Sequence, residues 1–340
     1  MAGGVGTRFW PRSRRGRPKQ LLPVLGRQSL LQMTVARLRG VVPPSRVLVV
    51  TARDQAAAVR RQLPGVPAAN VLAEPVGRNT APCLALAALE IGRRDPNATF
   101  VCLPADHAVR DVRTFRSLLA EAFTHAAAGS AVVTIGVQPT GPETGYGYIR
   151  VGRRLGGRTC RVRAFVEKPT VARARRFVRA GGYLWNAGIF LWSVPTALAL
   201  LDELLPEVIG PIRRATARPR RERGAALMRA YRRIKSVSID VGLAERAPEV
   251  RVVHGSFGWS DVGTWTALAA LGAEPGNPVV PVDASGYVVF NPDRLVALVG
   301  VDDLIVVDTP DALLICHRDR AQDVREVVRE LERRKLKAFT

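Results

Sequence analysis

Short apolar runs alternate with segments of helical spacing between residues 47 and 137. Near-continuous β-rich runs, typical of strands buried on both faces, occupy residues 47–52, 99–106 and 131–137. The intervening segments are rich in alanine and leucine at helical spacing and cover residues 54–63, 80–94 and 114–127. This alternation predicts an α/β fold with a doubly wound, mostly parallel, Rossmann-like sheet. Ligands of such sheets lie beyond the carboxyl ends of the strands.

The pattern changes in the second half of the chain. Residues 145–151, 158–169 and 186–194 favour strands, whereas residues 171–181 and 195–232 favour helices. Beyond Gly276, short strands and turn residues extend over residues 286–319, and an amphipathic helix follows at about 320–335. We therefore predict a main α/β domain over residues 1–275. Residues 276–340 are predicted to form a small C-terminal β tail with a terminal helix.

The strong positive charge raises the question of a nucleic-acid partner. The formal net charge is +22, but 46 of the 51 basic residues are arginine and they are spread over the whole length. Clustered basic residues are what release counterions from a polyanion, so we interpret this spread as a composition bias and expect no nucleic-acid partner. A lysine kept against this bias, as at Lys19 and Lys168, marks a position where arginine is not an equivalent replacement.

The cysteines and the apolar runs indicate where the protein works. The four cysteines are scattered singly, without a C-x-x-C pair, which argues against disulfides and a zinc site and favours a reducing cytoplasm. No apolar run approaches the ~18 residues needed to cross a bilayer, and no export signal is evident. We expect a cytoplasmic enzyme without a membrane partner.

The first residues, MAGGVGTRFW, contain a loop suited to hold phosphate. Its glycines allow close backbone approach to an anion, and its two polar residues can contact phosphate oxygens; these residues are Gly3, Gly4, Gly6, Thr7 and Arg8. The loop lacks the Gly-Lys-Ser/Thr ending of a Walker loop and the Rossmann dinucleotide spacing. Lys19 follows in RPKQLLPV, where it could meet a second phosphate.

Seven ordered segments resemble the sugar-1-phosphate nucleotidyltransferase family, and within it the branch that uses GTP and mannose 1-phosphate. They are GGVGTRFWPRSRRGRPKQLLPV, EPVGRNTAPCLALAAL, LPADHAV, TGYGYIRVG, FVEKPTVARARRFVRAGGYLWNAGIFLW, SIDVGLAERAPEVRVVHGSFGWSDVGTWTAL and LIVVDTPDALLICHRDRAQDV. The similarity spans nearly the whole chain. It implies a transferase that makes GDP-mannose and pyrophosphate from GTP and α-D-mannose 1-phosphate.

Two aspartates are candidates for a magnesium site. Asp106 follows a buried strand in LPADH, and Asp261 lies on the glycine-flanked loop GWSDVGTW. Mg²⁺ keeps several waters and takes one or two carboxylates together with substrate phosphates. The resemblance implies that Asp106 and Asp261 are the family's metal-binding pair and that Mg²⁺ is the cofactor.

The remaining roles also come from the resemblance. Arg8 and Lys19 would hold the triphosphate, and Lys168 would hold the phosphate of the sugar phosphate. Substrate contacts are implied for Glu167 and Asn186 with hexose hydroxyls, for Gly147 through close backbone approach to the sugar, and for Asn79 with guanine. Thr80 is expected to cap the helix that follows. Asp240, in SIDVGLAERA, departs from the family pattern in its next residue and receives no role.

Three alternatives stay open at this stage. One is a nucleotidyltransferase for another nucleotide and hexose 1-phosphate, such as UTP or dTTP with glucose. The second, from a different class, is a basic nucleic-acid-binding protein, against which the lack of stacking aromatics in the basic stretches counts. The third is a catalytically silent relative, although the motif acids and lysines are intact.

The resemblance also implies a homodimer with the tail as contact surface.

The loop at residues 3–8 stands unusually early in the chain. Relatives of this family begin with an apolar strand in the middle of the sheet, of which Met1 and Ala2 would be the remainder. We expect that five to eight further apolar residues precede Met1 in the natural chain. Without them, the sheet would have a gap at its centre and GTP binding would be weak, because the loop would be ordered at each binding event.

Overall fold

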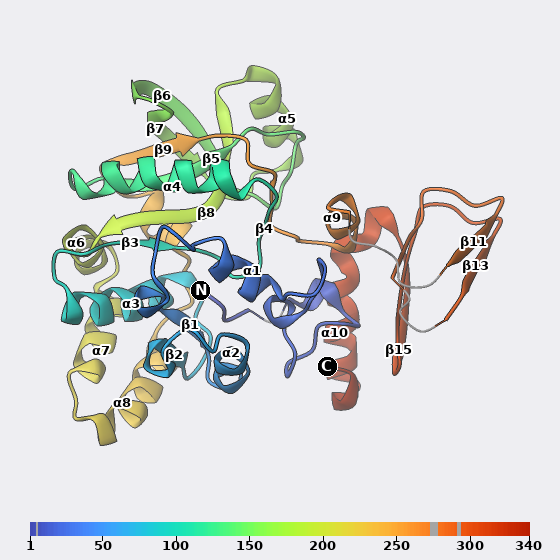
Figure 1. Ribbon diagram of the computed structural model, residues 1–340, viewed down its shortest axis with the longest axis horizontal. Coiled ribbons are helices and arrows are strands. Elements are labelled where there is room, and N and C mark those ends of the chain that lie inside the picture. Colours follow the sequence, from blue (N-terminus) through green and yellow to red (C-terminus); the bar gives the residue numbers. More distant parts are fainter. Residues whose placement is uncertain (5, 273–277, 291–293) are drawn as a thin grey trace.

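A computed structural model describes residues 1–4, 6–272, 278–290 and 294–340 (Figure 1). Its main part is built on a six-stranded sheet. The strands, in order of position, are β3 (Thr99–Cys102), β8 (Tyr183–Ser193), β5 (Val132–Val137), β9 (Val250–His254), β7 (Thr159–Val166) and β6 (Tyr148–Gly156). A parallel pair, β1 (Val49–Ala52) and β2 (Val71–Glu74), lies beside it.

Most strands of this layer run in the same direction. β9 pairs with β5 in parallel, and β3 and β5 both pair antiparallel with β8, so β3, β5 and β9 share one direction. β8 and β7 run against the other four strands of the sheet. The predicted α/β fold with a mainly parallel sheet is confirmed, and the reversal of β8 is an addition to it.

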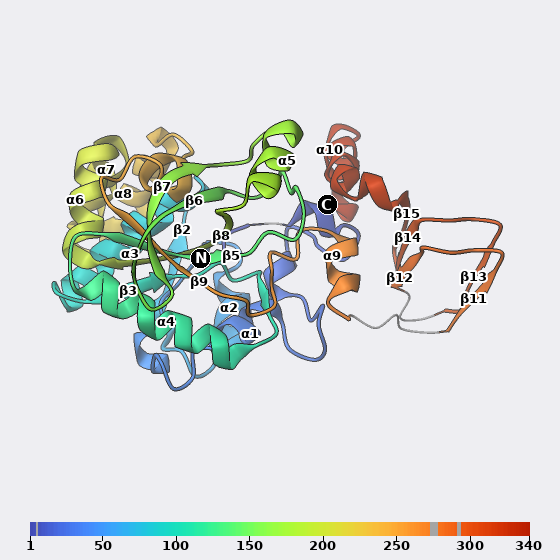
Figure 2. The ribbon, with the colours of Figure 1, turned by 90° about the horizontal axis from the view of Figure 1, so that it is seen from above.

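Helices cover both faces of the sheet (Figures 1 and 2). Residues of α3, α6 and α7 pack in one apolar cluster with Phe190 and Trp192 of β8. Residues of α1, α2 and α4 pack in a second cluster with the alternate residues Ile189 and Leu191. These helices and the others of the main part are α1 (Leu30–Ala36), α2 (Ala56–Gln62), α3 (Thr80–Arg94), α4 (Val112–Ala127), α5 (Val171–Ala180), α6 (Val194–Leu204), α7 (Pro206–Thr216), α8 (Arg220–Arg233) and α9 (Trp265–Ala270). Burial on both faces explains why β8 reads as a continuous apolar run.

The chain's first two residues lie between β1 and β3. The Met1 ammonium donates to the Leu103 carbonyl at 2.9 Å, and the Ala105 N–H donates to the Met1 carbonyl at 2.9 Å. On the other side, Ala2 forms a parallel bridge with Thr51. Met1 and Ala2 therefore join β1 to β3 as a strand of two residues, parallel to both.

A cavity of about 760 Å³ continues from Met1 along the space between these two strands. It is lined by residues 47–50 on one side, by residues 98–103 on the other, and by apolar side chains from the flanking helices. Because the pairing is parallel, residues placed before Met1 would run beside the first residues of β1 and β3. The cavity thus has the position and direction of an additional strand.

Adding four alternating valine and isoleucine residues before Met1 is expected to stabilise the protein. Ladder hydrogen bonds and the burial of four apolar side chains, less the entropy of ordering them, give about 3 kcal/mol in the free energy of unfolding. Chemical denaturation measures this change, and an extension of four glycine and serine residues is the matched control. Equal stability of the two extended chains would contradict the geometry proposed for the cavity.

The C-terminal tail consists of short strands and one helix (Figure 2). Its elements are β11 (Val279–Val282), β12 (Val288–Phe290), β13 (Val296–Val299), β14 (Leu304–Thr309), β15 (Ala312–His317) and α10 (Val324–Arg333). The predicted β tail with a terminal helix is confirmed. The expected boundary between residues 275 and 276 lies outside the described residues.

The tail packs against the start of the chain. Phe9 and Trp10 share an apolar cluster with Val324 of α10 and with residues of β12 and β14. The Trp10 indole N–H donates to the Phe339 carbonyl at 2.9 Å, and Arg15 forms an ion pair with Glu332. The tail therefore supports the segment that directly follows the opening glycine loop.

Candidate active site

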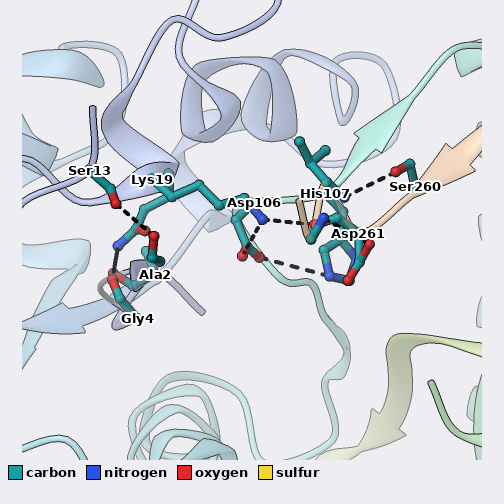
Figure 3. A network of polar contacts seen from close by, with 12 residues as sticks. Ala2, Gly4, Ser13, Lys19, Asp106, His107, Ser260 and Asp261 are labelled. Atoms are coloured by element: carbon teal, nitrogen blue, oxygen red, sulfur yellow. Dashed lines mark hydrogen bonds and ion pairs between the residues drawn. The ribbon is translucent and has the colours of Figure 1, made fainter. Parts of the chain in front are cut away.

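Lys19 connects two aspartates that are far apart in the sequence. It begins a short 3₁₀ turn after Pro18 and is 4% exposed. Its Nζ donates to the Asp106 carboxylate at 3.0 Å and to the Asp261 backbone carbonyl at 2.7 Å. Figure 3 shows the Lys19 side chain extending to these two residues. The predicted metal pair and the predicted phosphate lysine thus form one cluster.

A two-residue ribbon places the aspartates beside each other. Asp106 follows β3, just before β4 (Ala108–Val109), and Asp261 follows β10 (Trp259–Ser260). β4 pairs antiparallel with β10, with Ser260 opposite Ala108. This pairing fixes the spacing between the two loops that carry the acids.

Each carboxylate keeps one oxygen free of hydrogen bonds within the described residues. Asp106 receives the Lys19 ammonium on Oδ2, while Asp261 accepts from the Tyr146 hydroxyl at 2.8 Å and the Gly263 N–H at 3.0 Å, both on Oδ1. Burial acts to raise the pKa of Asp106, but the charge and the hydrogen bond of the Lys19 ammonium act against it, and the pKa lies below its usual value. Asp106 is therefore ionised at neutral pH and offers Oδ1.

The donor set fits a magnesium ion that is completed by substrate. Among the described residues, no group of three or more His, Cys, Asp or Glu side chains could hold a metal ion. Two carboxylates with one unoccupied oxygen each supply too few ligands for a protein-only site. Mg²⁺ prefers such an arrangement, because it retains waters and takes phosphate oxygens from its substrate.

The opening loop is packed tightly onto Lys19. Gly6 has φ +70°, and a Cβ there would lie 2.4 Å from the Lys19 Cβ, so only glycine fits. The Ser13 hydroxyl donates to the Gly6 carbonyl at 2.7 Å, and the Gln20 amide donates to the carbonyls of Ala2 and Gly4 at 2.9 Å. These hydrogen bonds fix the backbone of the loop.

Four further residues of the loop are accessible to solvent. Gly3 and Gly4 are exposed, and Thr7 and Arg8 are half-buried. Within the described residues, no hydrogen bond or ion pair engages the Thr7 hydroxyl or the Arg8 guanidinium. Both groups are available to a phosphate.

Glu167 and Lys168 directly follow β7. They form an ion pair in which the lysine side chain is 62% exposed and the glutamate 15%. Glu167 lines a pocket of about 190 Å³ together with Gly147, Asn186 and Asp261. A Cβ at Gly147 would lie 2.5 Å from the Glu167 carboxylate, so glycine is needed there for clearance. The predicted sugar residues thus share one pocket with a predicted metal ligand.

Asn79 lies apart from this pocket, at the start of α3. It has φ +68°, and its Oδ1 accepts from the Thr80 N–H at 2.9 Å, so Asn79 is the helix cap. The expectation that Thr80 caps the helix is wrong. Its hydroxyl instead accepts from the Ile239 N–H at 2.8 Å and ties this turn to the segment before Asp240. The exposed Asn79 side chain is free to meet a base on its amide nitrogen.

A sequence profile described as "Nucleotidyl transferase" matches residues 1–274. The chain belongs to the nucleotidyl transferase family. A second profile, described as "MannoseP isomerase/GMP-like beta-helix domain", matches residues 277–331 of this nucleotidyl transferase. Members of the family generally use a divalent metal ion.

Relatives with assigned names cover nearly all of this nucleotidyl transferase. It is 37% identical over 348 residues to mannose-1-phosphate guanylyltransferase of Escherichia coli strain K12, with 98% of this chain and 72% of the relative covered. It is 37% identical over 341 residues to xanthan biosynthesis protein XanB of Xanthomonas campestris pv. campestris, with the same coverage.

A solved structure has the same fold over the same extent. It is a crystal structure of a protein from Thermus thermophilus, described as mannose-1-phosphate geranyltransferase. It aligns with a TM-score of 0.87 and 40% identity over 98% of both chains. In the described part of our chain, none of the helices has the length and apolar character needed to span a bilayer.

Sequence reasoning missed three aromatic side chains of this nucleotidyl transferase site. Tyr146 donates to Asp261 and contacts Trp259 edge-on, and the Trp259 indole N–H donates to His107 Nδ1 at 3.2 Å. Burial lowers the pKa of His107, so the ring is neutral and accepts this bond. The adjacency of Tyr146 to Gly147, and of Trp259 to the Asp261 loop, is the signal that could have identified two of them.

Glu74 at the end of β2 should make stability depend on pH. It is 5% exposed, its Oε1 has no hydrogen-bond partner, and burial raises its pKa to about 7 against the lowering effects of Tyr231 and the N-terminal ammonium. The folded state therefore keeps a proton that the unfolded state releases near pH 4.5. The contribution of Glu74 to stability is therefore greatest below about pH 4.5 and falls as pH rises to about 7.

Glu74→Gln should flatten this dependence, because glutamine stays neutral. The difference in unfolding free energy between variant and wild type should change by up to about 3 kcal/mol across that interval. Chemical denaturation at a series of pH values measures it, with the exposed Glu332→Gln as control. A parallel profile for Glu74→Gln and wild type would show that Glu74 titrates normally.

Proposed function

We propose that this nucleotidyl transferase transfers GMP from GTP to α-D-mannose 1-phosphate, giving GDP-mannose and pyrophosphate. The observation that carries the proposal is the Lys19 cluster, which joins Asp106 to Asp261, a residue that lines the same pocket as Glu167 and Asn186. A relative named mannose-1-phosphate guanylyltransferase, aligned over 98% of this chain, supports the choice of nucleotide and sugar.

The reaction is an in-line displacement at phosphorus. A phosphate oxygen of mannose 1-phosphate bonds to the α-phosphorus of GTP, and the bond from this phosphorus to the bridging oxygen of the β-phosphate breaks. The nucleophile is already an anion at neutral pH, so the site needs no general base. Catalysis then consists of positioning and charge neutralisation.

The chain's own residues supply most of the positioning. Arg8 and the backbone of residues 3, 4 and 6 would bind the triphosphate, and the exposed Lys168 would orient the sugar phosphate. Lys19 supports the loop and holds Asp106 in its ionised form, while its ammonium adds positive charge toward the departing pyrophosphate. Mg²⁺ held by Asp106 and Asp261 would neutralise charge on the phosphates when bound.

Pyrophosphate release tests the function directly. The wild-type protein should release pyrophosphate with GTP and mannose 1-phosphate, and EDTA should abolish the release until Mg²⁺ is restored. UTP or dTTP in place of GTP, and glucose 1-phosphate in place of mannose 1-phosphate, should give much lower rates. Faster turnover with one of these pairs would overturn the assigned substrates, and no turnover with any pair would overturn the transferase function.

A homodimer through the tail is part of the proposal. The tail strands extend away from the main body (Figure 1) and present large exposed apolar side chains. The large exposed apolar side chains of the tail include Val280, Val282, Leu295, Val299, Leu313 and Ile315, each between 44% and 67% exposed. Light scattering should give twice the chain mass for the wild type and the monomer mass for Leu313→Asp/Ile315→Asp. A monomeric wild type would contradict the proposal.

The cysteines support a reducing compartment. All four are free thiols, and Cys83, Cys102 and Cys160 are buried. We propose the cytoplasm as the place of action, since GTP and a sugar phosphate are supplied there.

A further inference from the structure

Asp240 lies in the sugar pocket without a role in the reaction described above. The pocket of about 190 Å³ is lined by Gly147, Glu167, Asn186 and Asp240, with Asp261 at its edge. It therefore contains two carboxylates, Glu167 and Asp240, in addition to the predicted metal ligand. Glu167 has Lys168 as its ion-pair partner. Asp240 has no ion-pair partner among the described residues.

The amide of Asn186 has a fixed orientation. Its Oδ1 accepts from the Gly188 N–H at 3.1 Å and lies 3.0 Å from the Thr134 hydroxyl. A backbone N–H can only donate, so Oδ1 must face Gly188 and the amide nitrogen must point the other way. That nitrogen donates to Asp240 Oδ1 at 2.8 Å. Asn186 is 7% exposed, and its carbonyl oxygen is already engaged inside the protein.

The backbone around Asp240 is held on both sides. Asp240 begins a π-helical turn, Asp240–Ala244, of the kind that often occurs at functional sites. Before it, the Ile239 N–H donates to the Thr80 hydroxyl, which joins the turn to the loop that carries Asn79. After it, Glu245 accepts from the Glu167 N–H at 3.0 Å. The segment thus links the predicted base contact to the sugar pocket.

The Asp240 carboxylate is largely buried, so hydrogen bonds from a polar ligand would replace those that it has lost from water. Burial and the neighbouring Glu167 raise its pKa to about 6, whereas Lys168 and the Asn186 amide lower it. The group is still ionised near neutral pH. An ionised carboxylate can only accept hydrogen bonds, and the hydroxyls of a hexose are the donors that the proposed substrate brings into this pocket.

We propose that Asp240 determines sugar specificity by accepting hydrogen bonds from ring hydroxyls of the hexose, with Asn186 as the positioning residue that holds its carboxylate. Oδ1 is held by Asn186, and Oδ2 has no hydrogen bond from the described residues. Together with Glu167, this gives the pocket two anionic acceptors for the sugar. The inference rests on the proposed function, because the ligand of the pocket is taken to be the hexose of mannose 1-phosphate.

The test separates sugar binding from chemistry and from folding. Asp240→Asn keeps the shape and the bond from Asn186 but removes the charge, so its KM for mannose 1-phosphate should rise about 10- to 100-fold. Its KM for GTP and its midpoint of thermal unfolding should change little. Asp202→Asn, an exposed acid paired with Arg213, is the matched control and should behave as wild type.

Monodeoxy analogues of mannose 1-phosphate identify the hydroxyl. With the wild type, one analogue should have a much lower kcat/KM than mannose 1-phosphate. With Asp240→Asn, the same analogue and mannose 1-phosphate should have similar kcat/KM values. If Asp240→Asn does not fold, Asp240→Ser takes its place in the same assays.

The outcomes are distinguishable. The role of Asp240 alone is overturned if the wild type turns over mannose 1-phosphate but the Asp240 variant keeps the wild-type KM. In that case each monodeoxy analogue would also lose as much kcat/KM with the variant as with the wild type. A wild type that is inactive with GTP and mannose 1-phosphate overturns the proposed function and this inference with it.

Discussion

Asp261→Asn is expected to lower kcat for GDP-mannose formation by about 10²- to 10³-fold, the range found when one electrostatic contact to a transition state is removed. Asparagine keeps the oxygen that accepts from the Tyr146 hydroxyl and the Gly263 N–H, so the loop should stay in place. The change removes the negative charge that would hold Mg²⁺. The variant should also need a higher Mg²⁺ concentration for half-maximal activity.

The measurement is steady-state pyrophosphate release over a Mg²⁺ titration, with thermal unfolding as a check of the fold. Asp311→Asn in the tail is the control, because Asp311 is exposed and pairs with Arg14 away from the pocket. A folded Asp261→Asn protein with kcat within twofold of wild type would exclude Asp261 as a metal ligand.

Lys19→Met should also lower kcat, by about 10²-fold or more, but for a different reason. Methionine fills most of the space of the lysine but cannot donate to Asp106 or to the Asp261 carbonyl. The Asp106 carboxylate and the Asp261 carbonyl then lose their common hydrogen-bond donor. Asp106 also loses the nearby positive charge that lowers its pKa. The activity profile should therefore shift to higher pH.

The effect of Lys19→Met on stability should be small. Asp106 is 40% exposed and can be hydrated, so the lost ion pair contributes only about 1 kcal/mol. Lys337→Met, an exposed lysine at the end of the chain, controls for the loss of one positive charge. Near-normal turnover with an unchanged pH profile would show that Lys19 is merely structural.

Lysine cannot be replaced by arginine at position 19 without rearrangement. Its ammonium is enclosed between the Asp106 carboxylate and the Asp261 carbonyl, and the residue is 4% exposed. A guanidinium is longer and wider than an ammonium and needs several acceptors in one plane. The retention of this lysine in an arginine-rich chain has a steric reason.

The sequence predicts elements that are set by local pattern. The helix expected over residues 80–94 is observed as Thr80–Arg94, and the helix expected over residues 171–181 as Val171–Ala180. The direction of β8 could not be predicted in this way, because a strand that is buried on both faces has the same composition in either direction. Its reversal depends on which neighbours it joins.

In the candidate site, too, the sequence predicts single residues but not the contacts between distant segments. Asp106 and Asp261 could be named from their loops, but their common partner is the side chain of Lys19, 242 residues before Asp261. Asn79 and Thr80 are both suitable caps, and the positive φ of Asn79 decides between them. Asp240 gave no local signal at all, since its importance depends on Asn186 and Glu167, which lie more than fifty residues away in the chain.

The cavity beside Met1 also bears on how the protein responds to hydrostatic pressure. Pressure favours the unfolded state in proportion to the unfilled volume that unfolding eliminates. The apolar extension before Met1 should therefore reduce the magnitude of the volume change on unfolding relative to the glycine and serine extension, and unfolding under pressure measures this difference.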